Sequence, residues 1–109
     1  RDEEIVVAAA KMSFSFFLLN IHVVKGHSMQ PFLNEGDRVV VFRLAYLLSR
    51  PKVGDIIVFS GSDGKEYVKR VAAAVNSKFI VEGYNKTDSK SMLPITKDQI
   101  MGKVIFSYS

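Results

Sequence analysis

The chain has 109 residues, 48% of them hydrophobic, which fits one domain with a modest buried core. It contains no cysteine, and this excludes disulfide bonds, a thiolate nucleophile and a zinc–thiolate site; no metal or cofactor is expected. The net charge of +4 is scattered along the chain. Basic residues do not form a long run or alternate with aromatic residues as in single-strand binders, so no nucleic-acid partner is expected.

The first 20 residues form an apolar segment that we separate from the rest. Two apolar blocks, Ile5–Ala10 and Met12–Leu19, are divided by Lys11, and neither reaches the roughly 18 uninterrupted apolar residues that a spanning helix needs. Two interpretations stay open for residues 1–20. They are the trimmed end of a membrane anchor, or residues of artificial origin ahead of a soluble domain.

From residue 21 onward, the sequence favours β structure. Val, Ile, Phe and Tyr are frequent, and clear helical periodicity is rare. The expected strands are Ile21–Lys25, Arg38–Leu44, Ile56–Ser60, Glu66–Ala73, Ser77–Glu82 and Gly102–Tyr108. Short helical pieces or turns are expected over 45–50 and 94–100. No linker interrupts this series, so residues 21–109 are expected to form one compact, mostly β domain.

Two Gly-Asp turns precede apolar strands. Asp37 and Asp55 each follow a glycine and lead into a run of apolar residues. We interpret both runs as buried strands of one small barrel or sheet, and both aspartates as acceptors of backbone hydrogen bonds in their turns. Asp63, which precedes a glycine, marks the tip of a hairpin.

Ser28 and Lys69 are the candidate catalytic residues. A serine hydroxyl is a poor nucleophile until a nearby base removes its proton. Lysine is such a base only when neutral, and burial beside apolar groups disfavours its charged form. Strand alternation places Lys69 on the same face as Tyr67 and Val71, an environment of that kind. Ser–Lys pairs are a known variant of the Ser–His–Asp arrangement.

Four short motifs surround these two residues in a fixed order. They are Gly26-His27-Ser28-Met29-Gln30-Pro31-Phe32-Leu33, Gly36-Asp37-Arg38-Val39, Gly54-Asp55-Ile56-Ile57-Val58-Phe59 and Tyr67-Val68-Lys69-Arg70-Val71. Together they resemble the motifs of the type I signal peptidases, and the resemblance runs from about Ile21 to Phe106. It implies a membrane-associated serine endopeptidase that cleaves signal peptides from exported preproteins, with Ser28 as nucleophile and Lys69 as general base.

The resemblance also implies the fold, which is a small, coiled, β-barrel-like catalytic domain attached to the membrane by a preceding helix. Residues 1–20 would then be the remnant of that anchor, and the catalytic domain would lie on the extracytoplasmic side of the cell membrane. Residues 72–82 leave no room for the larger second domain that many relatives carry between Val71 and Gly83. A monomer is expected.

The family's late motif is matched only in part by residues 83–90. Asp88 and Ser89 fit it, whereas Lys86 stands where relatives have the serine that helps to hold the catalytic lysine. Arg70 is expected to pair with Asp88 and to tie this loop to the neighbouring strand. Arg70, Asp88 and Ser89 are therefore the expected structural support of the site.

An acyl-transfer site needs hydrogen-bond donors for the tetrahedral oxyanion. The backbone N–H of Ser28 is the first expected donor. Gly26 stands where some relatives add a serine hydroxyl, and a glycine there permits a tight bend and a close approach of substrate backbone. His22 and His27 are expected at the surface, outside the catalytic pair.

Substrate is expected to bind as an extended peptide that adds to exposed strand edges. The candidate edges are Val23–Lys25 and Tyr67–Lys69, and Met29 is expected either to shape a shallow pocket or to belong to the core. The substrate-binding candidates are Val23, Val24, Lys25, Met29, Tyr67 and Val68. The resemblance implies preprotein substrates with small residues, typically Ala-x-Ala, before the cleaved bond.

Three alternative functions stay open. A pilin-specific signal peptidase would use the same site. A catalytically weak relative that holds an extended peptide, as a pilus-assembly factor or chaperone, would accommodate the partial late motif. A self-cleaving protease of the SOS-repressor type has similar Ser-Met and Val-Lys-Arg motifs. Pro31 and the lack of an Ala-Gly cleavage site or a DNA-binding segment argue against it.

Overall fold

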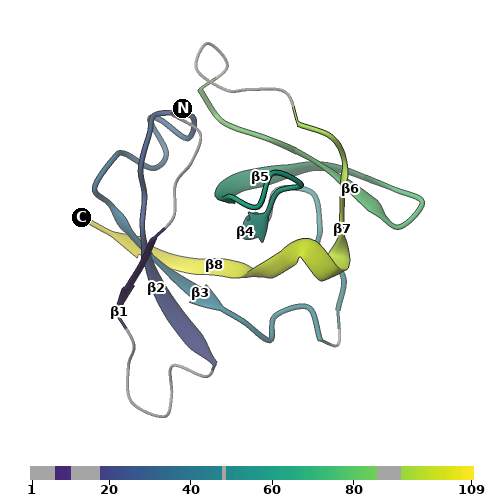
Figure 1. The fold of residues 1–109 in the computed structure, drawn as a ribbon, viewed down its shortest axis with the longest axis horizontal. Coiled ribbons are helices and arrows are strands. Elements are labelled where there is room, and N and C mark those ends of the chain that lie inside the picture. The colour runs from purple at the N-terminus through teal and green to yellow at the C-terminus, as the bar shows by residue number, and fades with distance from the viewer. Residues whose placement is uncertain (1–6, 11–17, 48, 86–91) are drawn as a thin grey trace.

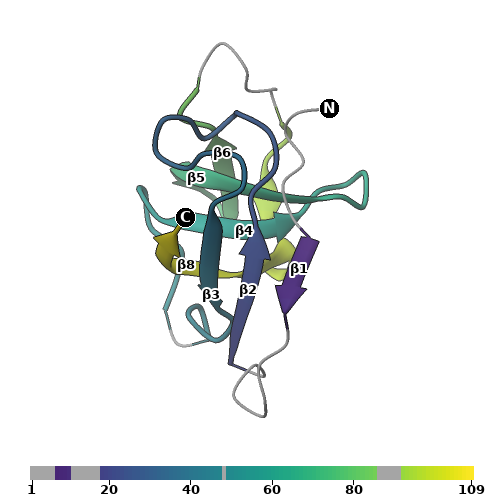
Figure 2. The same cartoon turned by 90° about the vertical axis from the view of Figure 1, so that its left-hand side faces the viewer.

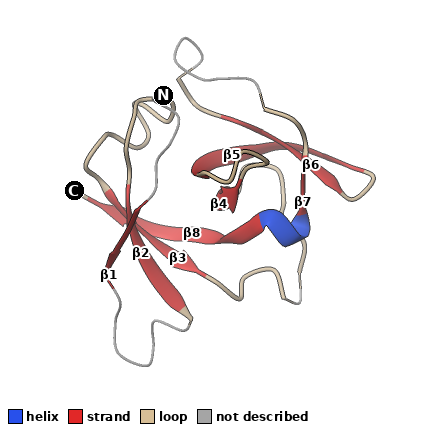
Figure 3. Ribbon diagram, viewed as in Figure 1, coloured by secondary structure: helices blue, strands red, loops and turns tan. Residues whose placement is uncertain are grey.

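The computed structural model describes residues 7–10, 18–47, 49–85 and 92–109. Its elements are β1 (Val7–Ala10), β2 (Leu19–Val23), β3 (Arg38–Phe42), β4 (Ile56–Ser60), β5 (Glu66–Val75), β6 (Lys78–Glu82), β7 (Ile95–Thr96), a 3₁₀ turn (Lys97–Gln99) and β8 (Ile100–Tyr108). Strands dominate the described residues (Figure 3), which confirms the predicted mostly β fold. The strand ends agree with the expected ones within about two residues, the usual uncertainty of such boundaries.

An antiparallel sheet contains all eight strands of the described residues, in the order β1-β2-β3-β8-β4-β5-β6-β7. β8 joins its two halves, because one part of β8 pairs with β3 and the other with β4. The register shifts within both pairings, and such irregularities bend a strand. In Figure 1, β1, β2 and β3 lie on one side and β4, β5 and β6 on the other, with β8 running between them. The sheet is coiled but not closed, since β1 and β7 are its two ends.

The coiled sheet wraps around its own core. In Figure 2, β1, β2 and β3 stand side by side, and β4 and β8 run across them. Buried apolar side chains come from both halves of the sheet and from the loops that precede and follow β3. They are Val24, Met29, Leu33, Val39, Val41, Tyr46, Ile56, Ile57, Val58, Phe59, Tyr67, Val68, Val71, Phe79, Val81 and Ile95.

The two strands predicted to be buried differ in how far they are covered. In β4, the residues Ile56–Phe59 are all buried, as a strand covered on both faces requires. In β3, Val39 and Val41 are buried, whereas Val40 and Phe42 are only partly buried. The prediction is confirmed for β4 and holds for one face of β3, because the other face of β3 does not meet the core.

The aspartates of the two Gly-Asp turns have the predicted role. Asp37 Oδ2 accepts a hydrogen bond of 2.9 Å from the backbone N–H of Asn34. Asp55 Oδ2 accepts one of 3.0 Å from the backbone N–H of Lys52. Both contacts span three residues, so local sequence alone was sufficient to predict them.

Part of the N-terminal apolar segment belongs to the sheet. β1 pairs with β2, with Val7 opposite Val23, and β2 begins at Leu19. The expected boundary between residues 20 and 21 therefore falls inside a strand. In the part of the chain that the structure describes, we find no helix with the length and apolar character needed to cross a membrane.

Gly102 lies in β8 at a point of close contact with β3. A Cβ atom there would lie 2.5 Å from Val41 Cγ1 and 2.8 Å from the carbonyl oxygen of Phe42. Because the second contact is with backbone, β8 has to shift, and we expect Gly102→Ala to lower the free energy of unfolding by about 1–3 kcal/mol. Urea denaturation measures this loss. Ser107→Ala, at the exposed end of β8, is the control, and equal stability of the two variants would contradict the packing.

Candidate active site

Ser28 lies in the loop between β2 and β3, residues 24–37, which we call the β2–β3 loop. The neck of this loop is closed by backbone hydrogen bonds. The N–H of Val24 donates to the carbonyl of Asp37 (2.8 Å), and the carbonyl of Val24 accepts from the N–H of Gly36 (2.9 Å). The two strands thus hold both ends of the loop, and Ser28 is buried at 2% exposure.

Side chains of the β2–β3 loop also anchor it to the core. Met29 and Leu33 are 2% and 0% exposed, and the N–H of Leu33 donates to the carbonyl of Met29 (2.9 Å). Met29, a candidate for the substrate pocket, is therefore a core residue. Phe32 is 53% exposed. Gly26 has a φ of +85°, a left-handed conformation that glycine adopts without strain, in keeping with the predicted bend.

Lys69 lies in the interior of β5, opposite Ile57 of β4. Its side chain is 0% exposed, which is rare for a lysine. Its strand neighbours Tyr67, Val68 and Val71 are also 0% exposed. Both faces of this part of β5 are therefore covered. The sequence pattern predicted an apolar environment on one face only, so Lys69 is more deeply buried than expected.

The structure brings Ser28 and Lys69 into direct contact. Lys69 Nζ lies 2.9 Å from Ser28 Oγ, with the amine donating to the hydroxyl oxygen. The two residues are 41 positions apart in the chain. A buried amine within hydrogen-bonding distance of a buried hydroxyl is the geometry in which lysine can activate serine.

The two expected substrate edges have different surroundings. Val23 lies opposite Val7 on one side and Arg38 on the other, so the expectation of an exposed edge at Val23 is wrong. The reason is β1, which could not be recognised as a strand from the sequence. Val24 is buried at the neck of the β2–β3 loop, whereas Lys25 is exposed.

The second edge, Tyr67–Lys69, pairs with β4 through its whole length. Pairing of β5 with β6 begins at Arg70, opposite Glu82. Tyr67, Val68 and Lys69 therefore precede the paired part of the β5–β6 hairpin.

Arg70 ties β5 to the segment that follows β6. Its guanidinium forms an ion pair with Glu82 and lies 5.2 Å from the centroid of the Tyr84 ring. The expected partner Asp88 lies outside the described residues, as do Ser89 and Lys86. Arg70 thus supports the hairpin next to Lys69, through a glutamate that the sequence did not single out.

Asn85 makes hydrogen bonds to the β2–β3 loop that were not predicted from the sequence. Its backbone N–H donates to the carbonyl of Ser28 (2.7 Å), and its side-chain Nδ2 donates to the carbonyl of His27 (3.0 Å). Tyr84, the preceding residue, stacks on Phe32 with ring centroids 5.0 Å apart. The partial match of residues 83–90 to the late motif pointed to this segment but not to these contacts.

The two histidines differ in burial. His27 is partly exposed beside Glu35 (3.2 Å), as expected. His22 is 2% exposed, and its predicted surface position is therefore wrong. Its side chain shares the inner face of the sheet with Val24, and neither ring nitrogen has a hydrogen-bond partner among the described residues. Burial lowers the pKa of His22 below its ordinary value of 6.5.

This lowered pKa predicts a loss of stability in acid. Below pH 6.5 the unfolded chain takes up a proton on His22 that the folded protein resists, so the free energy of unfolding falls as the pH falls. We expect His22→Leu to show a weaker decline than wild type in urea denaturation from about pH 7.5 to about pH 5.5. An identical decline in both proteins would show that His22 does not contribute.

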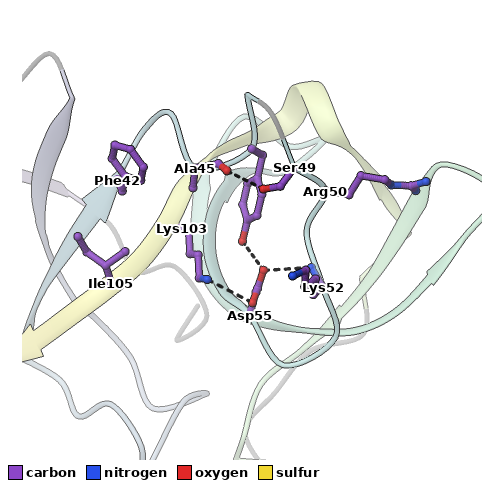
Figure 4. Close-up of a pocket in the computed structure, with 9 residues that line it drawn as sticks. Phe42, Ala45, Ser49, Arg50, Lys52, Asp55, Lys103 and Ile105 are labelled. Atoms are coloured by element: carbon purple, nitrogen blue, oxygen red, sulfur yellow. Dashed lines mark hydrogen bonds and ion pairs between the residues drawn. The ribbon is translucent and has the colours of Figure 1, made fainter.

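A pocket of about 240 Å³ lies elsewhere, around Asp55 (Figure 4). Asp55 accepts a hydrogen bond from the Tyr46 hydroxyl (2.7 Å) and forms an ion pair with Lys103 (3.6 Å). Burial, and then Asp55, raise the pKa of Tyr46. Neither Ser28 nor Lys69 lines this pocket. Within the described ranges, no group of three or more His, Cys, Asp or Glu residues is arranged to hold a metal ion.

Comparison with known sequences identifies the family. A family model described as signal peptidase, peptidase S26, matches residues 4–76, a span that includes both Ser28 and Lys69. The chain therefore belongs to the type I signal peptidase family, which confirms the resemblance found in its motifs.

Individual relatives agree with this assignment. Signal peptidase IB of Staphylococcus aureus strains Mu50 and N315 is 35% identical over 71 residues, which cover 65% of this chain and 36% of the relative. A protein named probable signal peptidase I-1, from Synechocystis sp., is 40% identical over 67 residues, which cover 53% of this chain and 34% of the relative. The chain thus matches about a third of the length of these relatives.

Proposed function

We propose that this protein is a signal peptidase that removes signal peptides from exported preproteins, with Ser28 as the nucleophile and Lys69 as the general base. The observation that carries the proposal is the 2.9 Å contact between Lys69 Nζ and Ser28 Oγ in a buried setting. Membership of the peptidase S26 family supports the same reaction class.

The burial of Lys69 supports its role as a base. An ammonium group in a position with 0% exposure loses its hydration, and this disfavours the charged form relative to the neutral amine. A neutral Nζ has a lone pair that accepts the hydroxyl proton of Ser28. Tyr67 and Val71, the buried strand neighbours on the same face as Lys69, thus help to keep the amine neutral in this proposal.

In the first half of the reaction, Ser28 Oγ attacks the carbonyl carbon of the scissile peptide bond while its proton passes to Lys69 Nζ. The C–N bond of the tetrahedral intermediate then breaks. Lys69 returns the proton to the leaving amine, which becomes the N-terminus of the mature protein. The signal peptide remains attached to Ser28 as an ester.

In the second half, water replaces the amine. Lys69 Nζ removes a proton from the water as the oxygen attacks the ester carbonyl. The C–O bond to Ser28 breaks, and the proton passes from Lys69 to Ser28 Oγ. The free carboxyl end of the signal peptide departs, and the hydroxyl and amine are restored.

Stabilisation of the oxyanion comes from the β2–β3 loop in this proposal. The backbone N–H of Ser28 is the first donor, as in other acyl-transfer sites that use the nucleophile's own amide. Gly26, with its φ of +85°, bends the chain two residues before Ser28 and carries no side chain to obstruct the approach of the substrate backbone.

The substrate in this proposal is an extended preprotein segment with small residues, typically Ala-x-Ala, before the cleaved bond. The segment adds to the Tyr67–Lys69 part of β5, next to the nucleophile. In this proposal the reaction takes place at the extracytoplasmic side of the cell membrane, and the domain acts there as a membrane-associated monomer.

The test is a cleavage assay with the full chain and a preprotein that carries an Ala-x-Ala site. Products are identified by mass and by N-terminal sequencing, over about pH 6 to pH 10. Cleavage directly after the Ala-x-Ala site, with a rate that rises with pH as Lys69 loses its proton, supports the proposal. A preprotein that stays intact across this range contradicts it.

The same assay separates the alternative functions. A pilin-specific peptidase cleaves a pilin precursor and leaves a general preprotein intact. A pilus-assembly factor or chaperone binds the peptide without cleaving it, and its binding survives Ser28→Ala. A self-cleaving protease cuts its own chain during incubation without substrate.

A further inference from the structure

We propose that Asn85 is a positioning residue that holds Ser28 at reacting distance from Lys69, with Tyr84 as its support. We call these two residues the 84–85 clasp. The inference rests on the proposed function, because it concerns the geometry of the same serine and lysine. It adds a third chain segment, after β6, to a site so far built from the β2–β3 loop and β5.

Asn85 donates two separate hydrogen bonds to the β2–β3 loop. Its backbone N–H donates to the carbonyl of Ser28 at 2.7 Å, and its Nδ2 donates to the carbonyl of His27 at 3.0 Å. The two acceptors belong to consecutive residues, so the peptide plane between His27 and Ser28 and the position of the serine Cα are both restrained. The carbonyl of His27 also accepts the N–H of Gln30 (3.1 Å) within the loop.

Tyr84 adds an apolar contact to the same loop. Its ring stacks on that of Phe32, with centroids 5.0 Å apart and an angle of 28° between the planes. Phe32 is 53% exposed, so about half of its surface is covered, and the Tyr84 ring is part of that cover. Aromatic pairs of this kind contribute roughly 0.5–1.5 kcal/mol beyond their buried area. The loop is thereby held on both sides of Ser28.

The other end of the clasp is fixed to the strand of Lys69. Arg70 directly follows Lys69, forms an ion pair with Glu82, and places its guanidinium 5.2 Å from the centroid of the Tyr84 ring. Arg70 and Glu82 are also opposite each other in the pairing of β5 with β6. A continuous set of contacts therefore runs from Lys69 through Arg70 and Tyr84 to the segment that holds Ser28.

Position 85 requires a side chain that can donate a hydrogen bond, because its partner is the backbone carbonyl of His27. A backbone carbonyl accepts hydrogen bonds and cannot donate them, so the side chain facing His27 has to carry an N–H or O–H donor. Aspartate has nearly the same shape but would place a carboxylate oxygen against the carbonyl oxygen. Asn85→Ala and Asn85→Asp therefore both remove this bond, and the second does so without leaving a cavity.

Displacement of a nucleophile by about 1 Å can lower a rate by about 100-fold. We expect Asn85→Asp and Asn85→Ala to lower kcat for preprotein cleavage by about 10- to 100-fold, with KM within about twofold of wild type, because ground-state binding does not depend on the serine position. Asn34→Ala, at the exposed far end of the β2–β3 loop, is the matched control and is expected to keep wild-type kcat.

A second measurement does not depend on catalysis. The N–H groups of Gln30 and Leu33 donate to carbonyls within the β2–β3 loop (3.1 and 2.9 Å), so their hydrogen exchange reports on the order of that loop. We expect Asn85→Asp to speed their exchange by about tenfold or more while the exchange of Val58, in the centre of the sheet, stays at its wild-type rate.

The two measurements distinguish the possible failures. Wild-type protein that cleaves no preprotein overturns the proposed function, while the exchange rates still test the clasp. Unchanged exchange at Gln30 and Leu33 in Asn85→Asp overturns the clasp. Faster exchange with unchanged kcat overturns the positioning role, since the loop would then be loosened without consequence for Ser28.

Discussion

Ser28→Ala is expected to lower kcat for preprotein cleavage by about 1,000-fold or more, because it removes the atom that forms the acyl intermediate. The loss follows from the chemistry and not from unfolding. The change deletes one oxygen at a site that is 2% exposed, and one lost hydrogen bond costs about 1–2 kcal/mol of stability. Cleavage is measured by gel and mass spectrometry at saturating preprotein, and folding by circular dichroism.

Ser62→Ala is the matched control for this prediction, since Ser62 is an exposed residue of the hairpin between β4 and β5. It is expected to keep wild-type cleavage. If Ser28→Ala still released mature protein at a rate within about tenfold of wild type, another nucleophile would be required, and the proposed mechanism would be wrong.

Lys69→Met is expected to lower kcat about as much as Ser28→Ala does. Unlike Ser28→Ala, it is not expected to lower the free energy of unfolding. Methionine fills nearly the same space but offers no base, so the hydroxyl of Ser28 keeps its proton. Because a fully buried amine is replaced by an apolar group of similar volume, the free energy of unfolding is expected to equal or exceed that of wild type. Cleavage assays and urea denaturation measure the two effects on the same preparation.

Lys78→Met provides the control, because Lys78 is exposed in β6 and its loss is expected to leave both kcat and stability near wild-type values. The pH dependence of cleavage supplies a further check. In wild type the rate should rise with pH until Lys69 is neutral, and the trace of activity left in Lys69→Met should not follow that curve. Retention of the wild-type curve in Lys69→Met would exclude this lysine as the base.

The pairing of Ser28 with Lys69 was predictable because it rests on motifs, each of which is short and continuous in the chain. The Gly-Asp turns were predictable for a related reason, since Asp37 and Asp55 bond to backbone only three residues away. Strand β4 was recognised from its unbroken apolar run, because a strand covered on both faces shows no alternation.

Other features could not be read from the sequence. His22 was expected at the surface, yet its side chain lies on the inner face of β2 next to Val24. The edge at Val23 was expected to be open, yet β1 covers it. In both cases the outcome depends on which segments lie beside β2, and a one-residue change of register would reverse which side chains face inward.

The sequence by itself determined the mostly β class, the turns, and the identities of the serine and the lysine, because these follow from local composition and short motifs. Only the tertiary structure decided that Lys69 is fully buried and that its Nζ lies 2.9 Å from Ser28 Oγ. It also decided that Asn85 donates hydrogen bonds to the backbone carbonyls before and after the Cα of that serine. These contacts join residues far apart in the chain, and the coiling of the sheet around β8 brings them together.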